Sequence, residues 1–236
     1  MDFSNRSVVI TGGTGALGTA VAANLLGLGA SCIIPYLHEA EAQRSPHRGD
    51  PKVTLIAAPD LSDEAAVAKV YDGIKSSAPL WASIHIAGRF APGKVADTGK
   101  AALMAQIDAN LVSCFLCSRA AVNAMLAAGS GGRIVNVASQ MALEWRTGAG
   151  SVAYTIAKTG IAALTVALAE EVAKNGILVN AVAPSIMDTP KNRQAMPKAD
   201  FDAWAKVEDV AATIAFLASP DNRVTRGAVV PVYGKT

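Results

Sequence analysis

Short apolar runs alternate with longer helical stretches along the whole of the 236-residue chain. The runs are continuous in Val, Ile and Ala instead of alternating with polar residues, which is typical of strands buried on both faces. They predict strands at 8–10, 31–35, 53–57, 81–86, 133–137, 177–183 and 228–232. The stretches between them predict helices at 16–28, 64–76, 100–128, 152–174 and 207–219.

This strand–helix alternation, with short connections, implies right-handed crossovers. We therefore expect an α/β fold, a Rossmann-type doubly wound parallel sheet of about seven strands with helices on both faces. No internal repeat or low-complexity linker divides the chain, so a single domain over 1–236 is expected. Two polar segments with prolines, 39–52 and 187–200, are predicted to be surface loops. The second follows a strand's carboxyl end, where ligands bind in such sheets, and a substrate lid is expected at about 187–206.

Bulk properties narrow the class of protein. Although 51% of the residues are hydrophobic, no apolar run reaches about 18 residues without a polar interruption, so we expect no membrane span. A net charge of +2 with dispersed basic residues argues against nucleic-acid binding. The first residues lack a secretory pattern, and three cysteines argue against a disulfide framework, which together indicate a cytoplasmic protein. Cys114 and Cys117 form a CxxC in an apolar helix, where two small buried residues are favoured over metal or redox chemistry.

A glycine-rich turn joins the first predicted strand to the first helix. It reads Thr-Gly-Gly-Thr-Gly-Ala-Leu-Gly over 11–18. Glycines let the backbone approach a pyrophosphate closely, while the helix N-terminus supplies unpaired N–H groups and a favourable dipole. A glycine turn without a ligand is the alternative, but the strand–turn–helix context favours dinucleotide binding.

Tyr154 and Lys158 lie four residues apart within the fourth predicted helix. Four residues is about one helical turn, so both side chains leave the same face. A lysine beside a tyrosine hydroxyl favours the phenolate, and we expect the pKa of Tyr154 to lie below its usual value of roughly 10. Such a phenol can donate or accept a proton near neutral pH. Alone the pair is a weak signal, because many exposed helices share this spacing.

Further residues complete a pattern along the chain. They are the turn at 11–18, Asp60 and Leu61, the step at 86–88, Asn110, Ser139, Tyr154, Lys158, and the segment 184–189. In order and spacing they resemble the short-chain dehydrogenase/reductase family across essentially the whole chain. The resemblance implies a nicotinamide-dependent oxidoreductase that moves a hydride between NAD(P) and a carbonyl or alcohol group.

The resemblance also implies a role for each of four catalytic residues. Tyr154 would pass a proton to or from the substrate oxygen, and Lys158 would poise Tyr154 and bond the nicotinamide ribose. Ser139 would steady the substrate oxygen by a hydrogen bond. Asn110, in mid-helix, would hold a water that links Lys158 to solvent. Taken alone, Ser139 is equally a strand-end cap and Asn110 a helix irregularity.

Cofactor contacts are implied in the same way. Asp60 would accept a hydrogen bond from the adenine amino group, while Ile186 and Thr189 would fix the carboxamide. Taken alone, Asp60 is more often a helix N-cap and Thr189 shapes a loop. The full set comprises Gly12, Thr14, Gly15, Leu17, Gly18, Tyr36, Asp60, Leu61, Ala87, Gly88, Tyr154, Lys158, Pro184, Ile186 and Thr189. No metal site is expected.

Several positions depart from the family pattern. Ala16 stands in place of a glycine in the turn, and Ser185 stands in place of a glycine at the first lid hinge, which we expect to be stiffer. His85 and Ile86 replace two asparagines, so the side-chain bonds of those asparagines to neighbouring strands are expected to be lost or replaced.

The residue at the end of the second strand bears on the choice of cofactor. Tyr36 stands where an acid would bind the ribose hydroxyls of NAD and repel the 2′-phosphate of NADP. No arginine follows it immediately, but basic side chains on the next segment could reach a phosphate, namely His38, Arg44, His47 and Arg48. We expect NADP or NAD, with NADP favoured because a missing carboxylate removes the main barrier.

An apolar, partly aromatic substrate pocket is expected. Its walls would come from Phe90, Met141, Leu143, Trp145 and Met187, with Gln140, Glu144 and Arg146 as candidate sources of polarity. This favours a small-molecule ketone or alcohol on a largely apolar or ring-bearing molecule.

Two other functions remain open. The segment 187–204 is also similar to quinonoid dihydropteridine reductases, which makes such an enzyme the alternative, although those enzymes lack a serine like Ser139. The second alternative is a non-catalytic dinucleotide-binding protein, against which the retained Tyr154 and Lys158 argue. Family members usually form dimers or tetramers through two long helices, here 100–128 and 152–174, and we expect a homotetramer or homodimer.

Overall fold

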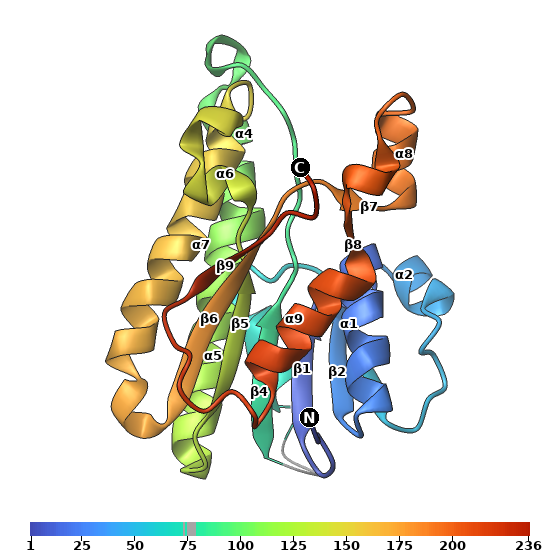
Figure 1. The fold of residues 1–236 in the computed structure, drawn as a ribbon. Helices are drawn as coiled ribbons and strands as arrows, with labels where there is room; N and C mark the ends of the chain where they lie inside the picture. The colour runs from blue at the N-terminus through green and yellow to red at the C-terminus, as the bar shows by residue number, and fades with distance from the viewer. Residues whose placement is uncertain (73, 75–78) are drawn as a thin grey trace.

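The computed structural model describes residues 1–72, 74 and 79–236, and a parallel β-sheet runs through its centre (Figure 1). In the described residues this sheet has seven strands in the order β3-β2-β1-β4-β5-β6-β9, with each neighbouring pair parallel. The strands are β1 Ser7–Thr11, β2 Ser31–Tyr36, β3 Val53–Ala57, β4 Leu80–His85, β5 Gly132–Val137, β6 Ile177–Pro184 and β9 Val229–Val232. The chain order reverses between β1 and β4, and the predicted doubly wound α/β fold is confirmed.

Helices cover both faces of the sheet (Figure 1). One face carries α1 and α9, which pack together, and the other carries α3, α5 and α7. Their bounds are α1 Ala16–Gly27, α3 Glu64–Asp72, α5 Ser113–Ala128, α7 Val152–Glu171 and α9 Val207–Ala218. The predicted helices agree closely with these, and the predicted end of the second helix, at 73 and 75–76, lies outside the described residues.

The strands hold the layers together by sending side chains to both faces. In β1, Val8 and Ile10 pack with α1 and α9, whereas Val9 packs with α3 and α5. All three side chains are fully buried. Burying one such side chain contributes about 1.5–3 kcal/mol. This two-sided burial explains why the strands read as unbroken apolar runs.

The long helix predicted at 100–128 contains an irregular turn. After α4 (Lys100–Gln106), a π-helical segment at Ile107–Val112 precedes α5. Asn110 lies in this segment, and its Nδ2 donates to the Gln106 carbonyl oxygen (2.9 Å). π-Helical turns within α-helices occur frequently at functional sites. The segment is the structural form of the irregularity that the sequence suggested at Asn110.

The two segments predicted as surface loops carry short regular elements instead, so that prediction was wrong in part. The elements are α2 Glu39–Arg44, β7 Met187–Asp188 and α8 Pro190–Ala195, and β7 pairs with β8 Ala205–Lys206, which follows the second segment. Thr189 caps α8, since its hydroxyl accepts from the Asn192 amide N–H (3.2 Å), and Pro190 occupies the first turn. Elements this short do not show a hydrophobic period in the sequence.

Two helical stretches, Lys100–Ala128 and Val152–Glu171, are long and apolar enough to span a membrane by length and composition alone. In the described structure both pack in the helical layer on one face of the sheet, as core helices of an α/β protein do. They therefore identify no clear membrane-spanning segment.

His85 takes over the cross-strand role of a missing asparagine. Its Nδ1 lies 2.9 Å from the Asn136 Oδ1 on β5, and its Nε2 lies 2.8 Å from the Ser83 Oγ. Burial lowers the pKa of His85 to about 4, so the imidazole is neutral at physiological pH. The asparagine bond expected to be lost or replaced is therefore replaced by an imidazole.

The CxxC pair lies in the protein core, as predicted. Cys114 and Cys117 are buried within α5, and the Cys114 Sγ donates to the Asn136 Oδ1 (3.3 Å). Burial raises the pKa of the Cys114 thiol to about 12. Both residues serve as small packing side chains.

Candidate active site

Two adjoining cavities open at the carboxyl ends of the strands. The larger, about 630 Å³, extends from the glycine turn across the ends of β2 and β3. The smaller, about 200 Å³, lies over the ends of β4, β5 and β6. Leu17, Ile86, Gly88 and Arg89 line both cavities. The pair therefore occupies the point where the strand order reverses, where open α/β sheets bind ligands.

Most residues expected to hold a cofactor line these cavities. Gly12, Thr14, Gly15, Leu17, Gly18, Tyr36, Asp60, Leu61, Ala87 and Gly88 line the larger cavity. Tyr154, Lys158 and Pro184 line the smaller one. Ile186 and Thr189 line neither, and the Thr189 hydroxyl is engaged as the cap of α8. Their expected contacts with a carboxamide stay predictions.

The glycine turn has the shape that a diphosphate needs. Gly12 has φ +69°, and a Cβ there would lie 2.8 Å from the Ala87 backbone nitrogen. A Cβ on Gly18 would collide with the Gly12 carbonyl oxygen. Because α1 begins with neither a side-chain cap nor an acidic residue, its first N–H groups can bind an anion. Ala16 lies outside these close approaches, and the turn fits a dinucleotide.

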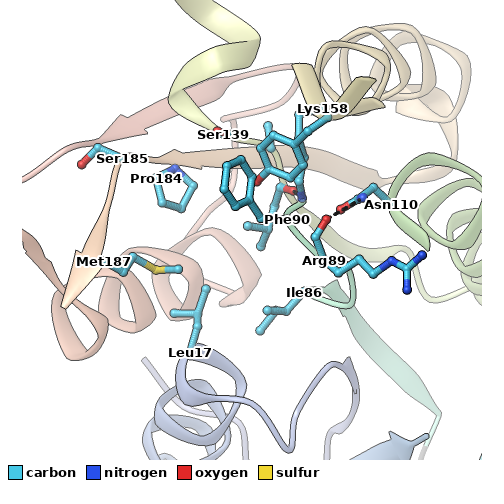
Figure 2. Close-up of a pocket in the computed structure, with 14 residues that line it drawn as sticks. Leu17, Ile86, Arg89, Phe90, Asn110, Ser139, Lys158, Pro184, Ser185 and Met187 are labelled. Atoms are coloured by element: carbon cyan, nitrogen blue, oxygen red, sulfur yellow. Dashed lines mark hydrogen bonds between the residues drawn. The ribbon is translucent and has the colours of Figure 1, made fainter. Parts of the chain in front are cut away.

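The four residues expected to be catalytic line the smaller cavity. Figure 2 labels three of them, Asn110, Ser139 and Lys158. Ser139 comes from the end of β5, Asn110 from the π-helical segment, and Tyr154 and Lys158 from α7. Phe90, which follows β4, contributes an aromatic wall beside Tyr154. Three separate elements thus bring the four side chains to one place.

Burial dominates the electrostatics of Tyr154 and Lys158. The Lys158 Nζ donates to the Val137 carbonyl oxygen (2.7 Å) and lies 5.8 Å from the centre of the Tyr154 ring. Burial lowers the pKa of Lys158 to about 8. Burial also raises the pKa of Tyr154 above its usual value, with the Ser139 side chain acting in the opposite direction. The expected lowering of the phenol pKa is thus corrected, because desolvation of the phenolate outweighs the opposing effect of the Ser139 side chain.

Asn110 presents a buried acceptor beside Lys158. Its Nδ2 donates to the carbonyl oxygens of Arg89 (3.0 Å) and Gln106, while its Oδ1 accepts no hydrogen bond from the described part of the chain. A Cβ built on Gly88 would meet that Oδ1 and lie 3.7 Å from the Lys158 Nζ, so both polar atoms border the Gly88 backbone. Buried acceptors normally have a donor. This one fits a hydroxyl group or a water beside Lys158.

Ser139 satisfies both interpretations of its position. Its Oγ accepts from the Met141 amide N–H (3.3 Å), which caps α6 (Gln140–Leu143). The same side chain lines the smaller cavity and acts on the pKa of Tyr154. A hydroxyl that accepts one hydrogen bond still has its own proton to donate. The strand-end cap therefore leaves Ser139 able to bind a substrate oxygen.

The expected substrate pocket is only partly assembled. Phe90 and Met187 line the smaller cavity. Leu143 and Trp145 are 40% and 69% exposed and line neither cavity. The Trp145 Nε1 donates instead to the Ala142 carbonyl oxygen (3.0 Å). Also outside both cavities are Met141, Gln140, Glu144 and Arg146. Of the five residues expected to form the apolar wall, Phe90 and Met187 therefore line the cavity in this structure.

One cavity-lining side chain was missed in the sequence. Glu41, in the first turn of α2, lines the larger cavity, and its Oε2 accepts from the Thr14 hydroxyl and the Leu37 amide N–H, both at 3.2 Å. The family pattern places the ribose-binding acid at position 36, five positions earlier, where this chain has Tyr36. The available signal was a pair of acidic residues, Glu39 and Glu41, at the start of a short helix within the segment predicted to be a loop.

The segment after β6 is tied down at two points. The Ser185 Oγ donates to the Tyr233 carbonyl oxygen (2.8 Å) and accepts from the Thr236 hydroxyl (2.7 Å). Asp188 bonds Arg193 (2.6 Å) and Lys206 (2.7 Å), and these cations hold the pKa of its carboxyl well below the usual range. The Ser185 bonds give a physical basis for the stiffer hinge expected there.

Known proteins resemble this chain over nearly its full length. Residues 6–200 match the family model for short chain dehydrogenases. The cis-4-hydroxycyclohexanecarboxylate dehydrogenase of Sinomonas cyclohexanicum is 36% identical over 250 residues, which cover 98% of this chain and 96% of the relative. The (2S)-[(R)-hydroxy(phenyl)methyl]succinyl-CoA dehydrogenase subunit BbsD of Thauera aromatica is 32% identical over 252 residues, covering 99% and 97%. The solved structure of ElxO with NADP bound gives a TM-score of 0.88 at 26% identity, with 98% of each chain covered. As the order of its motifs predicted, the chain belongs to the short-chain dehydrogenase/reductase family of oxidoreductases.

Proposed function

We propose that the protein is an NAD(P)-dependent oxidoreductase that interconverts a carbonyl and an alcohol group on a largely apolar or ring-bearing small molecule. The observation that carries this proposal is the convergence of Asn110, Ser139, Tyr154 and Lys158 on one cavity, next to a glycine turn shaped for a dinucleotide. The bound nicotinamide cofactor would supply or accept the hydride. The chain's own side chains would transfer the proton and bind the substrate oxygen.

Tyr154 is the proton donor and acceptor of the proposed reaction. Its raised pKa keeps the phenol protonated at neutral pH, which suits a general acid for carbonyl reduction. The Lys158 ammonium stabilises the phenolate that forms when the proton leaves. The Ser139 hydroxyl donates a hydrogen bond to the substrate oxygen. The Asn110 Oδ1 accepts a hydrogen bond from the hydroxyl group or water that lies beside Lys158.

The substrate class rests on the lining of the smaller cavity. Phe90, Met187, Leu17 and Ile86 present apolar surface around the polar group of catalytic side chains. Two relatives named above act on molecules whose names include a cyclohexane or a phenyl group. A ring-bearing ketone or secondary alcohol fits such a wall better than a highly charged substrate.

The test is a turnover assay with both cofactors against a panel of cyclic and aromatic ketones, with quinonoid dihydropterin included. We expect ketone reduction, and Tyr154→Phe should lower kcat by about a thousandfold or more while cofactor affinity stays within about twofold. Faster turnover of quinonoid dihydropterin would favour the dihydropteridine reductase alternative. If both the unmodified protein and Tyr154→Phe bind the cofactor but turn over no substrate, the non-catalytic alternative would be favoured.

The proposed enzyme acts as one dinucleotide-binding domain over 1–236 with a lid at about 187–206. Met187 reaches the smaller cavity from this segment, which supports a role in covering the substrate. The ion pairs of Asp188 with Arg193 and Lys206 hold the two short strands of the lid to its helix. Closure of such a lid would exclude water from the reaction.

We further propose that a second copy of the chain covers the outer faces of α5 and α7, giving a homodimer or homotetramer. Large apolar side chains are exposed there, namely Phe115, Leu126, Ile156 and Val166. Light scattering at micromolar concentration would show a dimer or tetramer, and Phe115→Glu should shift it toward monomer. The three cysteines are free and buried, which supports the proposed cytoplasmic setting.

A further inference from the structure

We propose that Glu41 selects the cofactor and makes this enzyme prefer NAD(H) to NADP(H). The inference rests on the proposed dinucleotide-dependent function, and it names a specificity residue for it. It also departs from the preference for NADP that the residue at position 36 suggested.

The carboxylate of Glu41 stands between two backbone segments that border the larger cavity. Its Oε2 accepts from the Thr14 hydroxyl in the glycine turn and from the Leu37 amide N–H directly after β2. In a doubly wound sheet, the space between that turn and the end of β2 receives the adenosine ribose. The half-buried side chain is thus held at the ribose end of the cavity by two hydrogen bonds.

Glu41 has acceptor capacity left for a ribose. A carboxylate offers about four acceptor positions, and the hydrogen bonds from Thr14 and Leu37 occupy two of them at Oε2. Its Oε1 accepts no hydrogen bond from residues 1–72, 74 and 79–236. The 2′- and 3′-hydroxyls of NAD could donate to it, whereas the 2′-phosphate of NADP would place negative charge beside negative charge.

The basic residues nearby do not compensate for this charge. The Arg44 Nε donates to the Ala40 carbonyl oxygen of its own helix (3.0 Å), and the His47 Nε2 lies 3.1 Å from the Thr19 carbonyl oxygen. Neither they nor His38 and Arg48 are among the described residues that line the larger cavity. Arg89 lines both cavities, but it follows β4, which β1 separates from β2 in the sheet. A 2′-phosphate would therefore meet a carboxylate without a paired cation.

Glu39 provides a matched control two residues away. It is exposed, lies in the same turn of α2, and its Oε2 accepts from the Tyr36 hydroxyl (3.0 Å), but it does not line the cavity. Replacing it removes one negative charge from the same helix without removing the carboxylate at the ribose end. A change in cofactor affinity that occurs in the Glu41 variants but not in Glu39→Gln therefore depends on the position of the carboxylate and not on the net charge of the helix.

The experiment measures binding without turnover. Dissociation constants for NADH and NADPH are obtained by fluorescence titration and calorimetry for the full chain and for Glu41→Gln, Glu41→Ala and Glu39→Gln. We expect the unmodified protein to bind NADH at least about tenfold more tightly than NADPH. Glu41→Gln and Glu41→Ala should each tighten NADPH binding by about tenfold and weaken NADH binding severalfold, whereas Glu39→Gln should keep the original ratio.

Failure of this inference can be told from failure of the proposed function. Equal affinity for both cofactors, tighter NADPH binding by the unmodified protein, or an unchanged ratio in both Glu41 variants would overturn the role of Glu41 while leaving the enzyme assignment intact. Binding of neither dinucleotide would overturn both proposals. Circular dichroism of each variant confirms that it is folded, and the ratio in the unmodified protein decides the preference independently of any variant.

Discussion

The ring of Phe90 stands edge-on to the ring of Tyr154, with centroids 5.0 Å apart and planes at 87°. Phe90 is half exposed, at 52%, although it lies against the side chain proposed to move the proton. An aromatic ring in this position fixes the phenol from one side and offers a stacking face to a substrate from the other. Edge-to-face pairs contribute about 0.5–1.5 kcal/mol beyond their buried area.

Phe90→Ala should therefore weaken substrate binding more than it slows the chemical step. We expect KM for a ring-bearing ketone to rise about tenfold, with kcat changed less than about threefold and cofactor affinity unchanged, because the truncated side chain leaves an apolar wall missing. Steady-state kinetics with cyclic and acyclic ketones measure this. Phe90→Leu, which keeps apolar volume, is the control and should retain most of the affinity. An unchanged KM in Phe90→Ala would show that the substrate lies elsewhere.

The buried ammonium of Lys158 predicts a falling rate at alkaline pH. Since burial lowers its pKa to about 8, the free enzyme loses this charge as the pH rises through about 8. The pKa of Tyr154 is raised, so the phenol keeps its proton in the same range. We expect kcat/KM for ketone reduction to be level below about pH 8 and to fall above it by up to about tenfold per pH unit.

A pH profile of kcat/KM at constant ionic strength measures this dependence. Lys158→Arg is the matched control, because a guanidinium stays protonated throughout the range and its residual activity should lack the fall near pH 8. A profile of the unmodified enzyme that stays level to about pH 10 would contradict the assignment of the charge to Lys158.

The sheet could be predicted from the sequence because each strand carries its own signal. Val8, Val9 and Ile10 are buried toward opposite faces, so an unbroken apolar run identifies the strand without knowledge of its neighbours. Tyr154 and Lys158 could be predicted for a similar reason, since one helical turn relates them. Features that depend on residues close together in the chain can therefore be predicted from the sequence.

Features that depend on distant parts of the chain could not be predicted. Glu41 reaches the glycine turn only because α2 brings it back toward Thr14, 27 positions earlier. The raised pKa of Tyr154 depends on burial and not on its spacing to Lys158. Trp145 lines neither cavity, and its Nε1 donates instead to the Ala142 carbonyl oxygen. Burial and loop conformation are products of the whole fold.

The buried imidazole of His85 should make the protein sensitive to acid. Its pKa falls from 6.5 to about 4 on folding, so between these values the unfolded chain binds a proton that the folded chain does not. The contribution of neutral His85 to stability is therefore fully present above about pH 6.5 and is lost as the pH falls toward about 4. Between these two pH values the free energy of unfolding should decrease by about 1.4 kcal/mol per pH unit, which amounts to about 3 kcal/mol over the whole range.

Denaturant unfolding at about pH 7 and about pH 4.5 measures this loss. His85→Asn retains an amide that can bond Asn136 but does not titrate, so it should lose about 2–3 kcal/mol less than the unmodified protein over the same range. Equal acid sensitivity in both proteins would place the titrating group elsewhere.

Ser185 should control the mobility of the lid through its two hydrogen bonds with the C-terminal residues Tyr233 and Thr236. Ser185→Ala removes both bonds, and Ser185→Gly also frees the backbone, so the pair separates bonding from chain flexibility. We expect amide hydrogen exchange at 187–206 to accelerate severalfold in Ser185→Ala and further in Ser185→Gly, with global stability lowered by about 1 kcal/mol. Exchange in the sheet strands serves as the internal reference. If both variants leave exchange at 187–206 unchanged, the C-terminal bonds do not restrain the lid.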